Sequence, residues 1–294
     1  MSRREAGIEG PARMETDDVK QEVDGTYIAP PIQRAVKLLR QIARGDTVSN
    51  MNRTARLLDI NRSTLFRLLK TLELEGLIEA TDDGSGYRIG IGLMEIAAQS
   101  AVSTDLIQVA APFLRRLAEQ VGLSAHLGIL DGTDVILMFR HTPAVPLTTN
   151  LQLGSRLPAH ATTLGRIILA QLPPAEVTEL YRGRTIAALT PKVPSNLKQL
   201  HAMLDEDRKL GLAHSFNHYL EGIASIAAPI FGQDGKVVAS LNVVGSIAAF
   251  DETKKNYQQL ADAVRTAGIE ISRRVTAGAT FRSREQRAPG IIPA

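Results

Sequence analysis

The sequence predicts an α+β fold in two domains, and three observations support this. Helical periodicity fills the chain between Ile32 and Glu75, and a turn-rich hairpin follows it. Pairs of β-prone segments then alternate with helices up to Val275, a pattern typical of helices packed on an antiparallel sheet. The length of 294 residues exceeds one ordinary core and suits two domains of common size.

The composition excludes several classes of site. The chain has no cysteine, which rules out disulfides, thiolate nucleophiles, cysteine-ligated zinc and iron–sulfur clusters. Because no apolar run could span a bilayer and the N-terminus has no signal-peptide core, we expect a cytoplasmic protein without membrane contact. The sequence shows no metal-ligand spacing among its six histidines, no nucleophile elbow and no phosphate-binding loop. We therefore expect no metal, no cofactor and no catalysis.

The segment from 30 to 90 predicts a winged helix-turn-helix domain. Apolar residues recur at three- and four-residue steps through three stretches, which indicates three amphipathic helices. A turn-rich stretch at 82–86 joins two β-prone segments and indicates a hairpin. Three helices followed by a hairpin is the order found in winged helix-turn-helix domains. The expected elements are helices over 32–44, 50–58 and 62–75, with Asn61 as an N-cap, and strands over 77–80 and 87–89, after a disordered tail at 1–29.

The third of these helices carries the candidate DNA contacts. Between Pro31 and Lys70 nine basic residues accompany two acidic ones, a local charge of +7 in a chain whose net charge is +3. At about 100° per residue, Ser63, Arg67 and Lys70 share the side opposite the leucines. We expect Arg67 to contact a base, and Arg62 and Lys70 to contact phosphates. The predicted DNA-binding residues are Arg53, Arg62, Ser63, Thr64, Arg67, Lys70 and Arg88.

Beyond residue 90 the sequence predicts a linker helix at 91–104, a second domain at 105–276 and a flexible tail at 277–294. Breaks in the helical pattern near Ser103 and Pro112 separate the linker from the second domain. Neighbouring β-prone pairs with helices between them indicate an antiparallel sheet. We expect strands over 124–130, 135–140, 147–151, 212–216, 223–231 and 237–244, and helices over 164–171, 176–181, 196–211 and 252–275.

Three parts of the chain resemble the IclR (isocitrate lyase regulator) family of bacterial transcription regulators. They are PIQRAVKLLRQIA with INRSTLFRLLKTLELEGLIE, LGSRLPAHATTLGRIILA at 153–170, and EGIASIAAPIFGQDGKVVASLNVVG at 221–245. The two C-terminal stretches are the specific ones, because a winged helix alone fits many families. The resemblance implies a second domain similar to the GAF/PAS fold, in which a curved antiparallel sheet holds a small effector.

Two parts of the chain supply candidate effector contacts. The helix expected at Thr163 has free backbone N–H groups in its first turn, which suit a carboxylate, and a cap by Thr162 or Thr163 is an equal alternative. By the resemblance, Ser225 and Asn242 meet the effector, and Ser215 lies where some members place an acid. At Asn242 the alternative is a buried amide with all its hydrogen bonds made. The predicted effector-binding residues are Thr163, Leu164, Gly165, Ser215, Ser225 and Asn242.

Together these features predict a transcription regulator that binds double-stranded DNA and responds to a small organic acid. Because a palindromic operator matches a two-fold protein, we expect a homodimer or homotetramer with contacts from the first helix and from 93–102. Two alternatives stay open. The C-terminal domain could be an enzyme, or the chain could be a ligand-binding module whose winged helix contacts only proteins.

Overall fold

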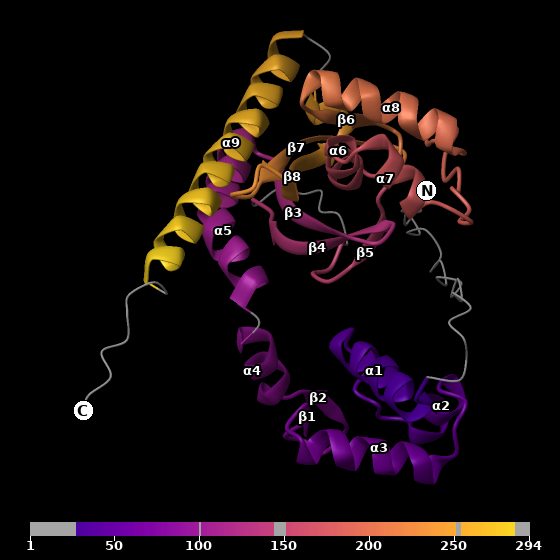
Figure 1. The fold of residues 1–294 in the computed structure, drawn as a ribbon. Coiled ribbons are helices and arrows are strands. Elements are labelled where there is room, and N and C mark those ends of the chain that lie inside the picture. The colour runs from indigo at the N-terminus through magenta and orange to yellow at the C-terminus, as the bar shows by residue number, and fades with distance from the viewer. Residues whose placement is uncertain (1–27, 100, 144–150, 251–253, 286–294) are drawn as a thin grey trace, which may run out of the picture. The chain divides into compact units, whose positions relative to one another are not determined.

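The computed structural model describes residues 28–99, 101–143, 151–250 and 254–285. The chain divides into two compact units, and the division falls between Gln99 and Ser100. Figure 1 shows the N-terminal unit in indigo and violet and the C-terminal unit in magenta to yellow. The predicted α+β class is confirmed, and residues 1–27 of the expected N-terminal tail lie outside the described residues.

The N-terminal unit has the predicted order of three helices and a hairpin. Asn50 and Asn61 cap the second and third helices, because their side-chain oxygens accept hydrogen bonds from the backbone N–H groups of Arg53 and Thr64, at 3.0 and 2.7 Å. Strands β1 and β2 pair antiparallel. The elements are α1 (Pro30–Ala43), α2 (Met51–Leu57), α3 (Arg62–Leu74), β1 (Ile78–Ala80), β2 (Tyr87–Ile89) and α4 (Ile91–Gln99).

The core of this unit fixes the orientation of α3. Leu65, Leu69 and Leu72 are buried together with Leu38 of α1 and Ile78 of β1. Burial of these leucines stabilises the packing of α3 and turns the opposite side of the helix to solvent.

The C-terminal unit is built on a six-stranded antiparallel sheet with the order β5-β4-β3-β8-β7-β6. A 3₁₀ turn over Ile247–Phe250 follows the last strand. The strands are β3 (Ser124–Asp131), β4 (Asp134–His141), β5 (Arg156–Pro158), β6 (Ala213–Phe216), β7 (Ile223–Phe231) and β8 (Val237–Ser246). The helices are α5 (Ala101–Val121), α6 (Thr163–Gln171), α7 (Pro174–Leu180), α8 (Leu197–Leu210) and α9 (Lys254–Glu285).

The two faces of the sheet carry different side chains. Helices α5 and α9 lie side by side on one face, while α6 packs on the other face with α7 and α8 around it (Figure 1). Ala125 and Leu127 of β3 belong to the apolar core under α5 and α9. Because side chains alternate along a strand, Ser124 and His126 point to the α6 face, where both are buried.

The structure corrects the expected breaks near Ser103 and Pro112. Helix α5 begins at Ala101 and continues through Pro112, so the expected linker at 91–104 is divided between α4 and α5. A proline removes one helical hydrogen bond. Ala110 and Leu114 on either side of it are fully buried in the core, and this packing stabilises the helix across the proline.

Strand β5 is an element that the sequence analysis does not predict. It has three residues and pairs with β4, and Arg156 connects it to the β3–β4 turn through Asp131 and Asp134, at 2.7 and 3.0 Å. So short a strand, ending in Pro158, carries no alternating pattern to detect. The strand expected at 147–151 falls almost entirely on residues 144–150, which lie outside the described residues.

Helix α9 corrects the expected tail at 277–294. It continues to Glu285, although the sequence analysis ends it near Val275. The stretch from 276 to 285 has no proline to end the helix, although it contains a glycine and two threonines, which are weak helix formers. Among the described residues, no helix is both long and apolar enough to cross a membrane.

Candidate DNA interface and effector site

The exposed side of α3 carries the predicted polar stripe. Ser63, Arg67 and Lys70 are exposed, as is Arg62 in the first turn. The hydroxyl of Ser63 donates to the side-chain oxygen Oδ1 of Asn61 at 2.8 Å, which fixes it beside the helix start. The helical phase expected from the sequence is therefore confirmed, while the DNA contacts themselves stay a prediction.

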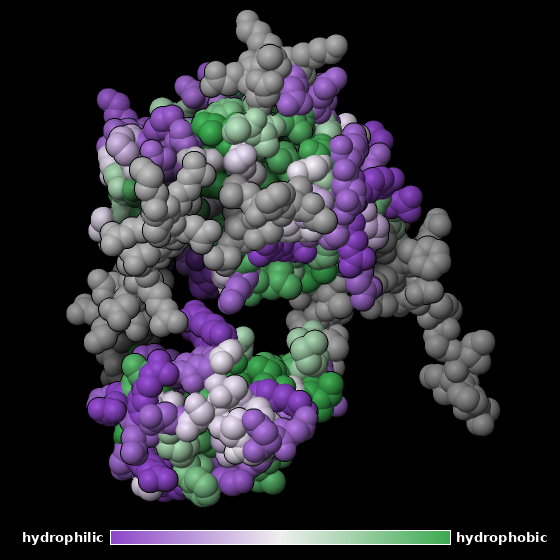
Figure 2. Space-filling model, turned by 180° about the vertical axis from the view of Figure 1, so that it is seen from behind, coloured by the Kyte–Doolittle hydropathy of each residue, from purple (hydrophilic) through white to green (hydrophobic). Residues whose placement is uncertain are grey.

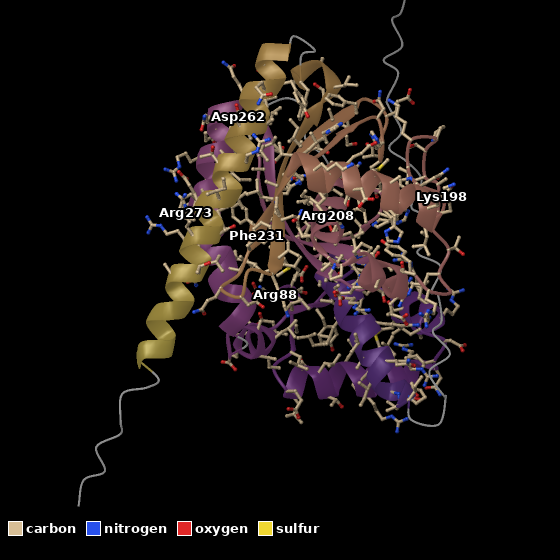
Figure 3. The ribbon with its side chains drawn as sticks, turned by 45° about the horizontal axis from the view of Figure 1, so that its top comes forward. Arg88, Lys198, Arg208, Phe231, Asp262 and Arg273 are labelled. Carbon is tan, nitrogen blue, oxygen red and sulfur yellow. The ribbon has the colours of Figure 1, made fainter. Side chains whose placement is uncertain are left out.

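The basic residues near this stripe differ in their ion pairing. Within the described residues, Arg62 and Arg67 make no ion pair. Lys70 pairs with Glu73 at 2.7 Å, and this carboxylate raises the pKa of Lys70. Arg53 lies 3.5 Å from Asp46, and Arg88, labelled in Figure 3, binds Glu79 at 3.0 Å. Of these five basic residues, Arg62 and Arg67 are therefore the two that have no ion-pair partner among the described residues to give up when DNA binds.

A groove runs between α3 and the hairpin. Its volume is about 1090 Å³. Arg62, Phe66 and Arg67 line one wall, and the hairpin tip at 84–87 lines the other. A phosphate backbone entering this groove would meet the two unpaired arginines.

The sheet face under α6 gathers polar side chains into neighbouring rows. Strand register places His126 opposite Asn242 across β3 and β8. It also places Ser225 opposite Ser215 across β7 and β6. All four are buried or nearly so, with exposed fractions of 1% for His126, 6% for Asn242, 8% for Ser225 and 5% for Ser215. Polar side chains in such surroundings are costly unless they are hydrogen bonded.

Helix α6 adds Thr163 to this face. Its hydroxyl lies 3.0 Å from the hydroxyl of Ser225 and accepts a hydrogen bond from the Asn242 amide nitrogen at 3.3 Å. Ser240, on the same face of β8 as Asn242, donates to the carbonyl oxygen of Leu164 at 2.8 Å. The structure thus brings Thr163, Ser225 and Asn242 together from three elements and holds Ser215 beside them.

The surroundings of Gly165 give a second reason for a glycine at the start of α6. Its N–H donates to the hydroxyl of Thr162 at 3.3 Å, so the helix start is capped as the alternative allowed. A side chain at this position would lie 2.2 Å from the Cα of Ala159. The glycine therefore permits close packing of the protein backbone, and its contact with an effector stays a prediction. Leu164 is buried in an apolar cluster with Val135.

Two buried atoms on this face have no hydrogen-bond partner among the described residues. They are His126 Nε2 and Asn242 Oδ1, which belong to residues paired across the strands. Burial and the nearby Arg140 together lower the pKa of His126 to about 4, against the smaller opposing effect of the Asn242 side chain, so the imidazole is neutral at pH 7. His126 is not among the residues predicted from the sequence, although its alternation with Ala125 and Leu127 is a usable signal.

Comparison with known proteins decides the family. The family model described as IclR helix-turn-helix domain matches residues 31–82, and the one described as bacterial transcriptional regulator IclR C-terminal matches residues 98–273. The chain belongs to the IclR family. This confirms the resemblance and the two-part organisation of a DNA-binding unit and an effector-binding unit.

Relatives of this IclR-family regulator span nearly its full length. The transcriptional regulator XynR of Escherichia coli K12 is 28% identical over 246 residues, covering 84% of this chain and 97% of XynR. The transcriptional repressor AllR of Klebsiella pneumoniae is 26% identical over 253 residues, covering 86% and 92%. The family and these relatives are transcription regulators, and so the chain is a DNA-binding regulator and not an enzyme.

Solved structures share the fold. A transcriptional regulator from Rhodococcus sp. RHA1 aligns with a TM-score of 0.73 at 27% identity, covering 85% of this chain and 100% of its own. An IclR homolog from Microbacterium hydrocarbonoxydans, solved in complex with 4-hydroxybenzoate, aligns with a TM-score of 0.73 at 24% identity, covering 84% and 99%. Because its identity with this chain is only 24%, the second structure shows a shared fold and nothing more.

A buried ion pair fixes α6 in the effector-binding unit of this IclR-family regulator. Arg166 of α6 donates to both carboxylate oxygens of Asp207 of α8, at 2.9 and 2.7 Å, and their side chains are 3% and 2% exposed. Arg208 of α8, labelled in Figure 3, donates to the Ala170 carbonyl at 2.6 Å. These bonds hold the helix that presents Thr163. The sequence analysis missed the pair, although one arginine among apolar residues in TLGRIILA is a signal for it.

The buried His126 makes the stability of this regulator depend on pH. In the unfolded chain the imidazole takes up a proton near pH 6.5, whereas in the folded chain it does so only near pH 4. The stabilisation by the neutral His126 is therefore present above pH 6.5 and is lost as the pH falls toward 4. By pH 5 the free energy of unfolding has fallen by about 2 kcal/mol on this account.

Urea titrations at pH 7 and pH 5 test this effect. Between these two pH values His126→Leu should lose less free energy of unfolding than the wild type. The matched control His201→Gln, at a partly exposed site, should behave as the wild type does, and an unchanged pH dependence in His126→Leu would contradict the assignment.

Proposed function

We propose that the protein is a homodimeric or homotetrameric regulator whose binding to a palindromic operator is modulated by a small organic acid. The observation that carries the effector proposal is the buried polar cluster of Thr163, Ser225 and Asn242 under α6. Its unpaired atoms, Asn242 Oδ1 and the nearby His126 Nε2, are groups that a ligand can satisfy. Because the target is operator DNA, we place the protein in the cytoplasm.

We infer that α3 lies in the major groove of the operator. The exposed, unpaired Arg67 is then placed to form a bidentate contact with guanine, and Arg62 to bind a phosphate. Lys70 and Arg88 exchange Glu73 and Glu79 for phosphates when DNA binds. The other proposed DNA contacts are Arg53, Ser63 and Thr64.

An acidic effector fits the polar face of the sheet. Arg140 is the cross-strand neighbour of His126, and its guanidinium supplies a positive charge beside the cluster. The N–H groups of Thr163 and Leu164, which have no acceptor within the described part of the chain, and the hydroxyls of Ser215 and Ser225 add donors for a carboxylate. The neutral His126 leaves Arg140 as the cation that selects an anion there.

Substitution of Asn242 tests the effector site. Asn242→Ala removes an amide and leaves its buried partners unpaired, so we expect a loss of about 1–3 kcal/mol of affinity for the acid. Ser225→Ala should weaken binding in the same direction, whereas Ser195→Ala, an exposed serine before α8, should not. Isothermal titration calorimetry with acids selected from a thermal-shift panel, benzoate and 4-hydroxybenzoate included, measures the affinities. Unchanged affinity in both Asn242→Ala and Ser225→Ala would place the site elsewhere.

Exposed apolar side chains on α1 and α4 support the dimer. Ile32 is 66% exposed, and Ile91, Met94 and Ile96 are 60–68% exposed. In Figure 2 hydrophobic side chains are visible among hydrophilic ones on the surface of the lower, N-terminal unit. Apolar surface of this kind is typical of a protein–protein interface.

Light scattering tests this assembly. The wild type should have the mass of a dimer or tetramer, and Met94→Glu should shift it toward the monomer because a charge enters the interface. The control Leu74→Glu, on the last turn of α3, should leave the mass unchanged. A wild-type monomer that still binds its operator tightly would contradict the proposal.

A further inference from the structure

One large apolar side chain lies on the exposed side of α3, beside the candidate DNA contacts. Phe66 is 52% exposed, although aromatic rings contribute most to stability when they are buried. It lies one position before Arg67, beside Lys70, and lines the groove between α3 and the hairpin. The core under α3 is completed by leucines, so the fold of this unit does not require the ring.

The structure holds this ring in a defined position. The Lys70 ammonium lies 5.9 Å from the centroid of the Phe66 ring, within the range of a cation–π contact. Glu73 in turn binds Lys70 at 2.7 Å. The three side chains follow one another along the helix and present the ring beside Arg67.

Exposure alone does not make an apolar residue of α3 a candidate DNA contact, and Leu74 is an example. It is 84% exposed on the same helix, but it lies in the last turn and does not line the groove. Phe66 combines exposure with a place among the candidate DNA contacts Arg62, Ser63 and Arg67. An apolar group there faces whatever occupies the groove.

We propose that Phe66 recognises the C5 methyl group of a thymine and so specifies a T·A pair next to the base contacted by Arg67. The thymine methyl is the apolar group that base edges present in the major groove, where every other distinguishing group is a hydrogen-bond donor or acceptor. Contact between the ring and this methyl removes apolar surface of both from water. The inference rests on the proposal that α3 enters the major groove.

Replacement of thymine by deoxyuridine tests this contact, because it deletes the methyl group and leaves every hydrogen-bonding group in place. A duplex bound by the wild-type protein is first selected from random sequences, and each thymine is then replaced in turn. We expect the wild type to lose about four-fold in affinity at one position per half-site, the effect of exposing one methyl-sized group. Phe66→Ala should bind the thymine and deoxyuridine duplexes at that position equally.

Matched variants separate this contact from general damage. Leu74→Ala should keep the four-fold discrimination, and Phe66→Leu should keep part of it. The midpoint of thermal unfolding of Phe66→Ala should equal that of the wild type, since the ring lies outside the core.

Failure to enrich any duplex would overturn DNA binding itself. Equal binding of all deoxyuridine duplexes by the wild type, or discrimination retained in Phe66→Ala, would overturn the methyl contact alone. A change of oligomeric mass in Phe66→Ala would assign the ring to a protein interface and overturn it as well.

Discussion

Replacement of Asp207 by alanine is expected to lower the free energy of unfolding by about 3–5 kcal/mol, the cost of breaking a buried ion pair. The substitution leaves the Arg166 guanidinium buried and charged between α6 and α8. One of its nitrogens, Nη1, already has no partner among the described residues, so no other acceptor compensates. Because α6 carries Thr163, the variant should also lose affinity for the effector.

Urea denaturation followed by circular dichroism measures this loss. Asp205→Ala is the matched control, since Asp205 lies on the same helix and pairs with Arg208 at the surface. Surface pairs contribute at most about 1 kcal/mol, so the control should unfold close to the wild type. The double variant Arg166→Met with Asp207→Leu should recover much of the stability, because it leaves no unpaired charge. Equal stability of Asp207→Ala and Asp205→Ala would show that the pair contributes little.

Arg67→Ala is expected to lower the affinity for the operator by about 1–3 kcal/mol and to relax the preference at one base pair per half-site. Arg67 is exposed and, within the described residues, has no ion-pair partner, so the loss on DNA is not offset by a released protein contact. Lys70→Ala should instead weaken binding to all DNA about equally. It should also reduce the slope of log affinity against log salt concentration by about one unit per lost phosphate contact. Because Lys70 must give up its ion pair with Glu73 to bind DNA, Lys70→Ala should lose less operator affinity than Arg67→Ala.

Titrations of both variants against operator and random duplexes at several salt concentrations distinguish these roles. Leu74→Ala serves as the control on the same helix. An Arg67→Ala variant that loses affinity for operator and random DNA in equal measure would identify Arg67 as a phosphate contact and leave base recognition to another residue.

The elements that the sequence predicts well are those determined by local patterns. Asn61 caps α3 because its side chain and the first turn are adjacent in the chain, and the leucine spacing fixes which side of the helix is buried. The end of α9 and the continuity of α5 through Pro112 depend on packing and propensity that a local pattern does not contain. Strand β5 depends on a partner strand and on Arg156.

The effector site shows the same limit. The sequence predicts Thr163 as a site residue from a helix start, and Ser225 and Asn242 from a family resemblance, and the structure brings the three side chains into contact. His126 and the Arg166–Asp207 pair depend on strand register and on contacts across 41 residues of chain, which no local motif encodes. The glycine at 165 fits both ligand binding and backbone packing, and the proximity of Ala159, which accounts for the packing, could not be read from the sequence.

The most direct test of the central claim measures operator affinity with and without an organic acid that binds the protein. We expect a saturating acid to change the operator affinity of the wild type by a factor of about 5–150, the usual range of coupling between two sites. Asn242→Ala should bind the operator as the wild type does and should respond only at higher acid concentration. An acid that binds the C-terminal unit and leaves operator affinity unchanged would contradict the claim that this protein is an effector-controlled regulator.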